Sequence, residues 1–343
     1  VFDGLPLYEP FHLRLLLSPA SLLDPRVLSG LDVHAGGFTA EFGDRMSAVI
    51  EATSLRPVAD QYYELGLSLF HANALASQRF DGERGQWLAA IRRSNLDEVA
   101  DLVESEIGEP SYIDGFGRID YAFSPDTRGS LHVLLSSDRA EVLKSDETEF
   151  ADVEYRNSYV WGTLEHDFSA ALGGRAILSY TDVAADRTGD VNNGGIRVGA
   201  VDDERHYDVL GVKLDGRYAA RRWLHRFGVE LRSLAADYDY TSTLRYEPDS
   251  LYPGFPGLAV DRALSPEPAG DHVAAYATSR VLATDRLAAE IGLRWDEQTY
   301  AGDAHDQWSP RLNLVYEAGS ATRLRASWGR FHQFQGINEL QVE

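Results

Sequence analysis

The chain of 343 residues contains no cysteine and a single methionine. The absence of thiols excludes disulfide frameworks, thiolate metal sites and cysteine nucleophiles. It also suits a compartment in which free thiols would be oxidised. Basic residues are few as well, because 32 Lys and Arg stand against 54 Asp and Glu, which gives a formal net charge of −22. We therefore expect no nucleic-acid partner, since the phosphate backbone would repel so acidic a protein.

Long hydrophobic runs are missing too. No stretch of about eighteen apolar residues occurs, so the sequence predicts no membrane-spanning helix. The opening VFDGLPLYEP has neither the basic start nor the apolar core of a secretory signal, and we expect it to be internal to a longer chain. A membrane β-barrel is still allowed, because each of its strands needs only about ten alternating residues.

Alternation with a period of two is the dominant pattern. In the stretch 285–300 the apolar residues Leu287, Ala289, Ile291, Leu293 and Trp295 share one face, and the opposite face carries charge. Similar splits occur in 207–218, 225–233 and 322–330. In 111–123 the outer set would be Ile113, Ile119, Tyr121 and Phe123, with Asp114, Arg118 and Asp120 inside. Helical spacing is confined to 94–108, which we interpret as a short loop helix.

The connections between these strands are of two alternating kinds. Short turns are expected at 124–129, 172–175, around Arg221, at 283–285 and at 317–321, and long loops at 97–111, 140–157, 183–205, 241–270 and 300–306. With two short strands in 61–80, this predicts about thirteen strands in an antiparallel up-and-down meander. Aromatic residues near the turns suit a membrane interface: Tyr121, Phe123, Phe168, Tyr218, Trp223 and Tyr316. The pattern favours an all-β transmembrane barrel, although a soluble sandwich or propeller would also fit it.

Two stretches at the start of the chain carry a family resemblance. VFDGLPLYEPFHL followed by LDVHAGGFTAEFGDRMSAVIEATS resembles the second half of the plug domain of TonB-dependent outer-membrane receptors. The resemblance implies that residues 1–56 are the C-terminal part of a plug and residues 57–343 the N-terminal part of a barrel. The tail WGRFHQFQGINELQ is similar to a barrel strand and loop of that family. Ala35, Thr39 and Asp44 depart from the pattern, and Asp44 weakens the expectation of a positive-φ turn at its position.

The resemblance also implies a function and its partners. It predicts a receptor in the bacterial outer membrane that binds a scarce solute, such as a siderophore, other metal chelate, cobalamin or oligosaccharide. A TonB-type coupling protein would supply the energy for import, and outer-membrane lipid would surround the barrel. Such plugged barrels have about twenty-two strands, so the barrel is expected to be incomplete here. The alternative function is a soluble or surface β-protein that binds carbohydrate or a protein through acidic loops.

Five residues are the candidate functional positions that the resemblance implies. Tyr8, His12 and Arg14 in YEPFHLR match an apical plug loop and are the expected solute-binding residues. The alternative is that Tyr8 and Phe11 pack in the plug core and His12 has no role in binding. Glu41 and Arg45 are expected where the plug meets the charged wall. The expected wall partner of Arg45 is one of three glutamates, Glu165, Glu230 or Glu290.

Catalysis and cofactors are not expected. The sequence lacks a GxSxG elbow, a GxxxxGK[ST] loop and a zinc-binding HxxE helix. Asp202, Asp203, Glu204 and His206 fall in an expected loop, where they could bind a divalent cation or simply be solvated. Glu165 and Asp167 would share one strand face, where charge balance with arginine is favoured over acid–base chemistry. We therefore expect no catalytic residue, no metal and no enzyme activity.

Overall fold

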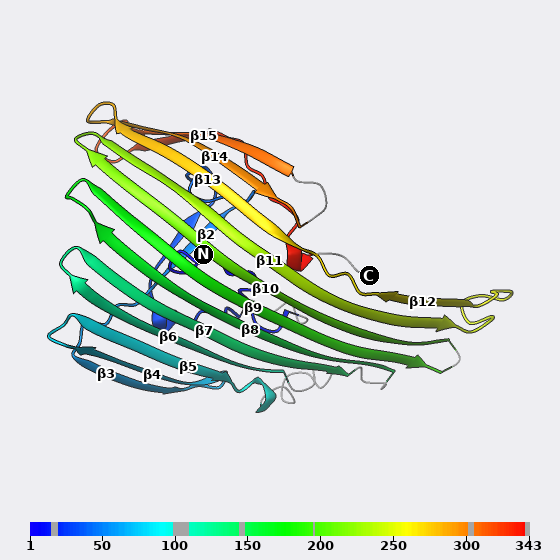
Figure 1. Cartoon of the computed structure of the whole chain (residues 1–343). Helices are drawn as coiled ribbons and strands as arrows, with labels where there is room; N and C mark the ends of the chain where they lie inside the picture. The colour runs from blue at the N-terminus through cyan, green and yellow to red at the C-terminus, as the bar shows by residue number, and fades with distance from the viewer. Residues whose placement is uncertain (15–19, 99–109, 144–147, 195, 301–304, 340–343) are drawn as a thin grey trace.

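A computed structural model describes residues 1–14, 20–98, 110–143, 148–194, 196–300 and 305–339. In it a large antiparallel sheet curves around a smaller inner segment, residues 1–56 (Figure 1). The strands of the large sheet are β3 (Gln61–Leu67), β4 (His71–Phe80), β5 (Gly85–Ser94), β6 (Ser111–Ser124), β7 (Thr127–Leu143), β8 (Glu149–Asp167), β9 (Leu172–Asn193), β10 (Arg197–Ala220), β11 (Trp223–Tyr246), β12 (Leu258–Leu264), β13 (Ala269–Leu282), β14 (Leu287–Gln298), β15 (His305–Glu317) and β16 (Arg323–Gly329).

The large sheet is a meander in which each strand pairs with its neighbours in the sequence. The strands pair in sequence order from β3 to β16 with one exception. On the main path β11 pairs with β13, and β12 lies off this path and pairs with β11 alone. The predicted all-β, antiparallel, up-and-down architecture is confirmed. The sheet has fourteen strands where about thirteen were predicted. Within the described residues it stays open, with β3 and β16 at its edges.

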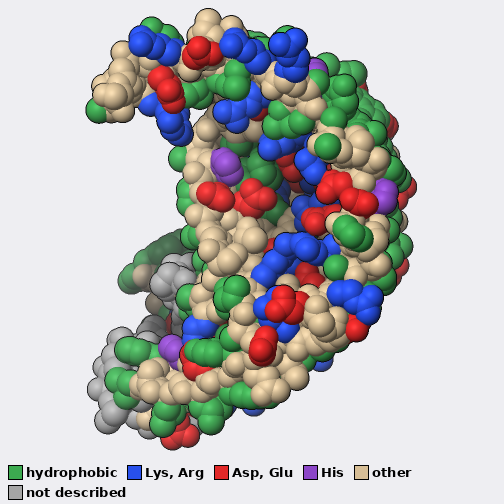
Figure 2. Space-filling model, turned by 90° about the vertical axis from the view of Figure 1, so that its left-hand side faces the viewer, with side chains coloured by type: hydrophobic (Ala, Val, Ile, Leu, Met, Phe, Trp, Pro, Cys, Tyr) green, Lys and Arg blue, Asp and Glu red, His purple; other side chains and the backbone are tan. Residues whose placement is uncertain are grey.

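The two faces of the sheet differ in polarity as the alternation predicts. On β14 the outward Ile291 and Leu293 are 65% and 44% exposed, whereas the inward Arg294 is 1% exposed. On β6 Asp114 and Arg118 point inward and are buried. Figure 2 views the shell from the end with the short turns, where charged side chains gather within the curve and apolar ones along its convex side. An apolar outer face with a polar lumen is the pattern that lipid requires of a barrel.

The strands β9, β10 and β11 are much longer than a bilayer needs. They have 22, 24 and 24 residues, against about ten for a crossing. The prediction of long loops at 140–157, 183–205 and 241–270 is therefore wrong for most of their length. The ladder between β9 and β10 runs unbroken from Leu172 to Asn193. The Asp and Gly content that indicated loops lies instead on strands that extend beyond the apolar band.

The short turns agree better with the sequence, except that 172–175 belongs to β9 and the turn before it lies at 168–171. The turn around Arg221 is confirmed, and Arg221 itself has a φ of 49° between the paired Ala220 and Trp223. Of the expected loop helix at 94–108, residues 96–98 are helical, Ser94 is the last residue of β5, and 99–108 lies outside the described residues. Among the described residues, no helix has the length and apolar character to cross a membrane.

The inner segment holds η2 (Pro25–Val27) and a two-stranded antiparallel sheet, β1 (Leu28–His34) and β2 (Val49–Ser54). It has no separate core. Phe2 is completely buried, with its ring centroid 5.0 Å from that of Phe116 on β6 and 5.7 Å from that of Trp161 on β8. Apolar burial of this kind stabilises the contact by about 25 cal/mol per Å². The hydrophobic core thus joins the inner segment to the large sheet, which is called the wall below.

Candidate functional site at the contact of the inner segment with the wall

An apex loop, residues 8–22, forms the part of the inner segment that approaches the long strands; residues 15–19 lie outside the described ranges. Two backbone hydrogen bonds close its base. The Leu22 amide donates to the Pro10 carbonyl at 3.0 Å, and the His12 amide donates to the Ala20 carbonyl at 2.8 Å. Residues 10–12 and 20–22 are therefore held side by side, which positions Leu13 and Arg14 next to them.

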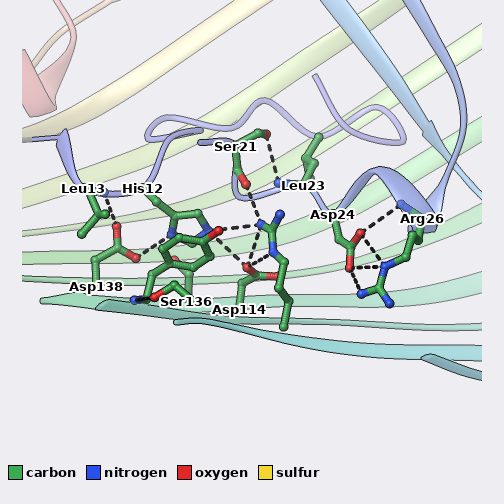
Figure 3. Close-up of polar contacts among 12 residues, drawn as sticks. His12, Leu13, Ser21, Leu23, Asp24, Arg26, Asp114, Ser136 and Asp138 are labelled. Carbon is green, nitrogen blue, oxygen red and sulfur yellow. Dashed lines mark hydrogen bonds and ion pairs between the residues drawn. The ribbon is translucent and has the colours of Figure 1, made fainter. Parts of the chain in front are cut away.

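His12 is clamped between two wall carboxylates (Figure 3). Its Nδ1 lies 2.6 Å from Asp138 Oδ1 on β7, and its Nε2 lies 3.2 Å from Asp114 Oδ2 on β6. Its ring stacks on that of Tyr112, with 4.0 Å between the ring centroids, and its side chain is completely buried. Because both ring nitrogens are engaged, the clamp fixes the orientation of the imidazole as well as its place.

Asp138 holds the backbone as well as the ring. Its second oxygen accepts a hydrogen bond of 2.7 Å from the Leu13 amide. Leu13 has a φ of 51°, in the left-handed region, which costs a non-glycine residue about 1–2 kcal/mol. Leu13 is also buried, at 2% exposure. The strained backbone is thus maintained by its carboxylate partner and by packing, and it redirects the chain toward Arg14.

Arg92 on β5 completes the cluster. Its guanidinium bonds the Asp114 carboxylate at 2.8 Å and donates to the Ser21 carbonyl at 2.7 Å, so it holds the other side of the apex loop. The cluster contains two carboxylates and one guanidinium, and its charges balance when His12 is protonated. Burial by itself lowers the pKa of His12, but the hydrogen bonds and charges of Asp114 and Asp138 outweigh it and raise the pKa above 6.5.

A pH dependence follows from this raised pKa. The stabilisation from protonated His12 is fully present below its unfolded pKa of about 6.5 and is lost as the pH rises through the higher folded value. We expect the unfolding temperature of the full-length receptor to fall across that window more steeply for wild type than for His12→Asn. Intrinsic fluorescence melts from pH 5.5 to 9 would measure it. Parallel curves for the two proteins would contradict a protonated clamp.

A pocket of about 230 Å³ lies beside the apex loop, between it and the wall. Glu9 and Arg14 line it from the loop, and their side chains form an ion pair of 2.5 Å. The Arg14 guanidinium also lies over the ring of Tyr155, 4.3 Å from its centroid. The wall contributes two further arginines and two further tyrosines: Arg187, Arg205, Tyr207 and Tyr238. Such a set of guanidinium groups and phenols can bind an anionic, hydrogen-bonding ligand.

The three residues predicted to bind solute have different environments. Arg14 lines the pocket, with its side chain 31% exposed. Tyr8 packs its ring edge-on against Tyr207 at a centroid distance of 6.0 Å. His12 is enclosed in the clamp and has no exposed surface. Solute binding by the three stays a prediction, in which His12 would act by positioning Arg14.

Glu41 and Arg45, the residues predicted at the wall, also differ. The Glu41 carboxylate lies 4.0 Å from Lys213 Nζ and 3.9 Å from Arg226 Nη1, both on the wall. Arg45 contacts its own neighbour, donating to the Asp44 carbonyl at 2.5 Å with the Asp44 carboxylate 3.7 Å away. Asp44 has a φ of 54°, so the positive-φ turn that its identity seemed to weaken is present.

The three glutamates considered as partners of Arg45 have partners on the wall instead. Glu165 lies 3.8 Å from Arg175, and Glu290 accepts from Asn313 at 3.3 Å. Glu230 is bonded to Arg232 and lies 3.5 Å from Arg294. None of these contacts, among the described residues, reaches Arg45.

Two wall arginines that the sequence did not single out donate hydrogen bonds to backbone carbonyls of the inner segment. Arg294, on β14, donates to the Glu41 carbonyl at 3.1 Å and binds Asp296 at 2.8 Å. Arg311, on β15, donates to the Phe38 carbonyl at 3.2 Å, with its guanidinium 4.8 Å from the Phe38 ring centroid. The signal available in the sequence was the inward register of these charges on alternating strands.

Asp3 provides a further anchor. Its carboxylate accepts from the Ser54 hydroxyl at 2.5 Å and lies 3.6 Å from Arg118 and 3.4 Å from His132 on the wall. Burial raises the pKa of Asp3, but these hydrogen bonds and the Arg118 charge outweigh it and lower the pKa to about 2. This anchor is therefore ionised at neutral pH.

The two acidic groups noted in the sequence, 202–206 and the pair Glu165 and Asp167, lie on strands, and arginines pair with their carboxylates. Residues 202–206 belong to β10 and not to a loop, so that expectation is corrected. Asp203 binds Arg205 and Arg187, and the described residues contain no group of three or more His, Asp and Glu arranged to hold a metal. Asp167 lies 2.6 Å from Arg217.

Comparisons with known proteins agree with this geometry. The family model described as "TonB dependent receptor-like, beta-barrel" matches residues 104–342. A search of curated proteins gave no match. Solved structures are similar in fold at low identity. The pyoverdine outer membrane receptor FpvA from Pseudomonas aeruginosa PAO1, bound to pyoverdine, has a TM-score of 0.66 at 14% identity, over 95% of this chain and 54% of its own.

Two further receptors show the same partial coverage. The siderophore receptor PiuA from Acinetobacter baumannii has a TM-score of 0.63 at 13% identity, over 93% of this chain and 56% of its own. The unliganded ferric citrate transporter FecA has a TM-score of 0.65 at 13% identity, over 95% of this chain and 52% of its own. The chain therefore spans about half the length of these structures.

Proposed function

Because the chain belongs to the TonB-dependent receptor-like β-barrel family, we propose that it is the later plug and first part of the barrel of a solute importer. Residues 1–56 would be the plug part and residues 57–343 the wall. Proteins of this family are outer-membrane receptors and not enzymes, so the chain is a component of the bacterial outer membrane. The alternative of a soluble β-protein is set aside by this membership.

The observation that carries the proposal is the seating of the inner segment. It lies within the curve of the sheet and contacts the charged inner face through Asp3, His12 and Glu41. His12 is completely buried between its carboxylates and Phe2 is completely buried against the wall, so both charge pairing and apolar burial hold the segment in place. An unaided solute would therefore not displace the segment, and import needs work on it from outside. We propose that a TonB-type coupling protein supplies this work.

The pocket beside the apex loop supports a solute-binding role. A solute that reaches it from the side of the long strands would meet Arg14, which already lies in an ion pair and over an aromatic ring. The proposed solute is a scarce compound such as a siderophore, other metal chelate, cobalamin or oligosaccharide. Among these, an anionic chelate is favoured, because three arginines line the pocket against two carboxylates, Glu9 and Asp203.

Removal of the Arg14 guanidinium tests this role. Cells with the full-length receptor would first be screened for receptor-dependent growth on ferric chelates, cobalamin and oligosaccharides. We expect Arg14→Ala to weaken uptake of the supporting solute by about tenfold or more, as for loss of a charged hydrogen bond. Arg84→Ala, in the exposed turn after β4, is the matched control. Equal uptake by the two variants would refute the assignment.

A further inference from the structure

The inner face of the sheet changes character where the long strands extend past the apex loop. Closer to the short turns it carries charges that contact the inner segment. Farther out, small and apolar residues stand beside a few charged ones, Glu149, Arg187 and Arg197. The small and apolar residues that share this face by strand register are Ala151, Gly189, Val191, Gly199, Val201 and Leu244. They line a trough of about 810 Å³.

Two glycines, Gly189 and Gly199, lie on the face that lines the trough. A Cβ added at Gly199 would lie 2.6 Å from the Thr243 carbonyl oxygen and 3.3 Å from Val191 Cγ1. At Gly189 it would lie 3.0 Å from the Phe150 carbonyl oxygen. A side chain at either position would therefore press against the backbone of a neighbouring strand, so the floor of the trough carries no side chain there. Apolar surface held open on a strand pair beyond the lipid-facing band is a feature of binding sites.

The trough adjoins the polar pocket of the apex loop. Arg187 lines both, so they are neighbours along β9. The trough is also lined by two positively charged side chains, Arg197 and Arg262. Arg197 forms an ion pair with Glu149. A ligand that spans both would place a polar, anionic part by Arg14 and Arg187 and an apolar part along Val191 and Val201.

We infer that the trough binds an apolar arm, an acyl chain or similar substituent, of an amphiphilic anionic solute whose polar part occupies the pocket beside Arg14. This inference rests on the proposed function and narrows its substrate class. The continuity of the two sites through Arg187 identifies the occupant as part of the solute. An arm of this kind would give the receptor preference for an acylated solute over its polar core alone.

Straight-chain alkanoates from butanoate to decanoate are the probes for this inference. The full-length receptor in nanodiscs would be titrated with them by calorimetry. Each methylene buried in the trough should tighten binding about fourfold, until the trough is filled. The double variant Val201→Thr/Leu244→Asn keeps the side-chain sizes and should remove most of this dependence. Val198→Thr, at a 46% exposed position on the outer face, is the control and should retain it.

Three results would overturn the inference. The first is binding without chain-length dependence. The second is a dependence that the double variant retains, because the probes would then bind elsewhere or in lipid. The third is no binding of any alkanoate to the wild-type receptor, which would show that the trough takes no apolar arm. Uptake that still depends on Arg14 in the same preparations would leave the proposed function standing.

Discussion

Replacement of Asp138 by alanine is expected to release the apex loop from the wall. Both oxygens of this carboxylate are used, one by the His12 ring at 2.6 Å and one by the Leu13 amide at 2.7 Å. The carboxylate is 1% exposed, so water does not replace it. Removal of one member of a buried charged pair costs about 3–5 kcal/mol. The left-handed backbone of Leu13 loses its support in the same step.

The expected result is a local change with a functional consequence. In the full-length receptor, amides of residues 11–14 should exchange hydrogen at least a hundredfold faster in Asp138→Ala, as about 3 kcal/mol requires. Solute binding should weaken as well, because Arg14 is positioned by the turn at Leu13. Hydrogen exchange with mass spectrometry measures the first effect and equilibrium binding the second.

Two further variants make this test specific. Asp138→Asn keeps an oxygen for the Leu13 amide but removes the charge, so it should fall between wild type and Asp138→Ala. Asp152→Ala removes a carboxylate from an ion pair with Arg139 on the exposed side of the wall and should change little. Equal exchange in all four proteins would show that the clamp does not hold the loop.

The wall was predictable because a barrel face is encoded by alternation. The charges on 111–123 and 285–300 fall inward as expected, with Asp114 at 5% exposure and Arg294 at 1%. Strand ends were not predictable in the same way. Beyond the bilayer both faces of β9 and β10 meet water or small residues, so Asp202 and Glu204 look like loop residues although they belong to β10. Composition does not predict these strand ends, because no lipid-facing apolar side is required beyond the bilayer.

The site was predictable only in outline. The apex loop was located by resemblance, and Arg14 does line a pocket. The partners of His12 lie 102 and 126 residues away in the chain, and no local spacing brings Asp114 and Asp138 to one imidazole. Sheet register does so, because both carboxylates point inward on adjacent strands. For Arg294 and Arg311 the alternation indicates an inward side chain, but not the backbone carbonyls that each contacts.

The central claim is that residues 1–56 form a plug that must move relative to the wall during import. Because the chain has no cysteine, a pair introduced here adds the only thiols of these 343 residues. Ala40 is buried in the inner segment, and a Cβ at Gly292 on β14 would lie 3.0 Å from its Cβ. A disulfide prefers about 3.5–4.5 Å between Cβ atoms, so a small shift would allow one.

The decisive measurement is therefore solute uptake by cells whose full-length receptor carries Ala40→Cys and Gly292→Cys. After oxidation, we expect solute binding to persist and uptake to fall to the background of cells without receptor, with recovery on reduction. Each single cysteine variant should import equally under both conditions, which controls for the substitutions themselves. Full uptake through the oxidised, demonstrably cross-linked receptor would contradict the claim that the inner segment must leave the wall.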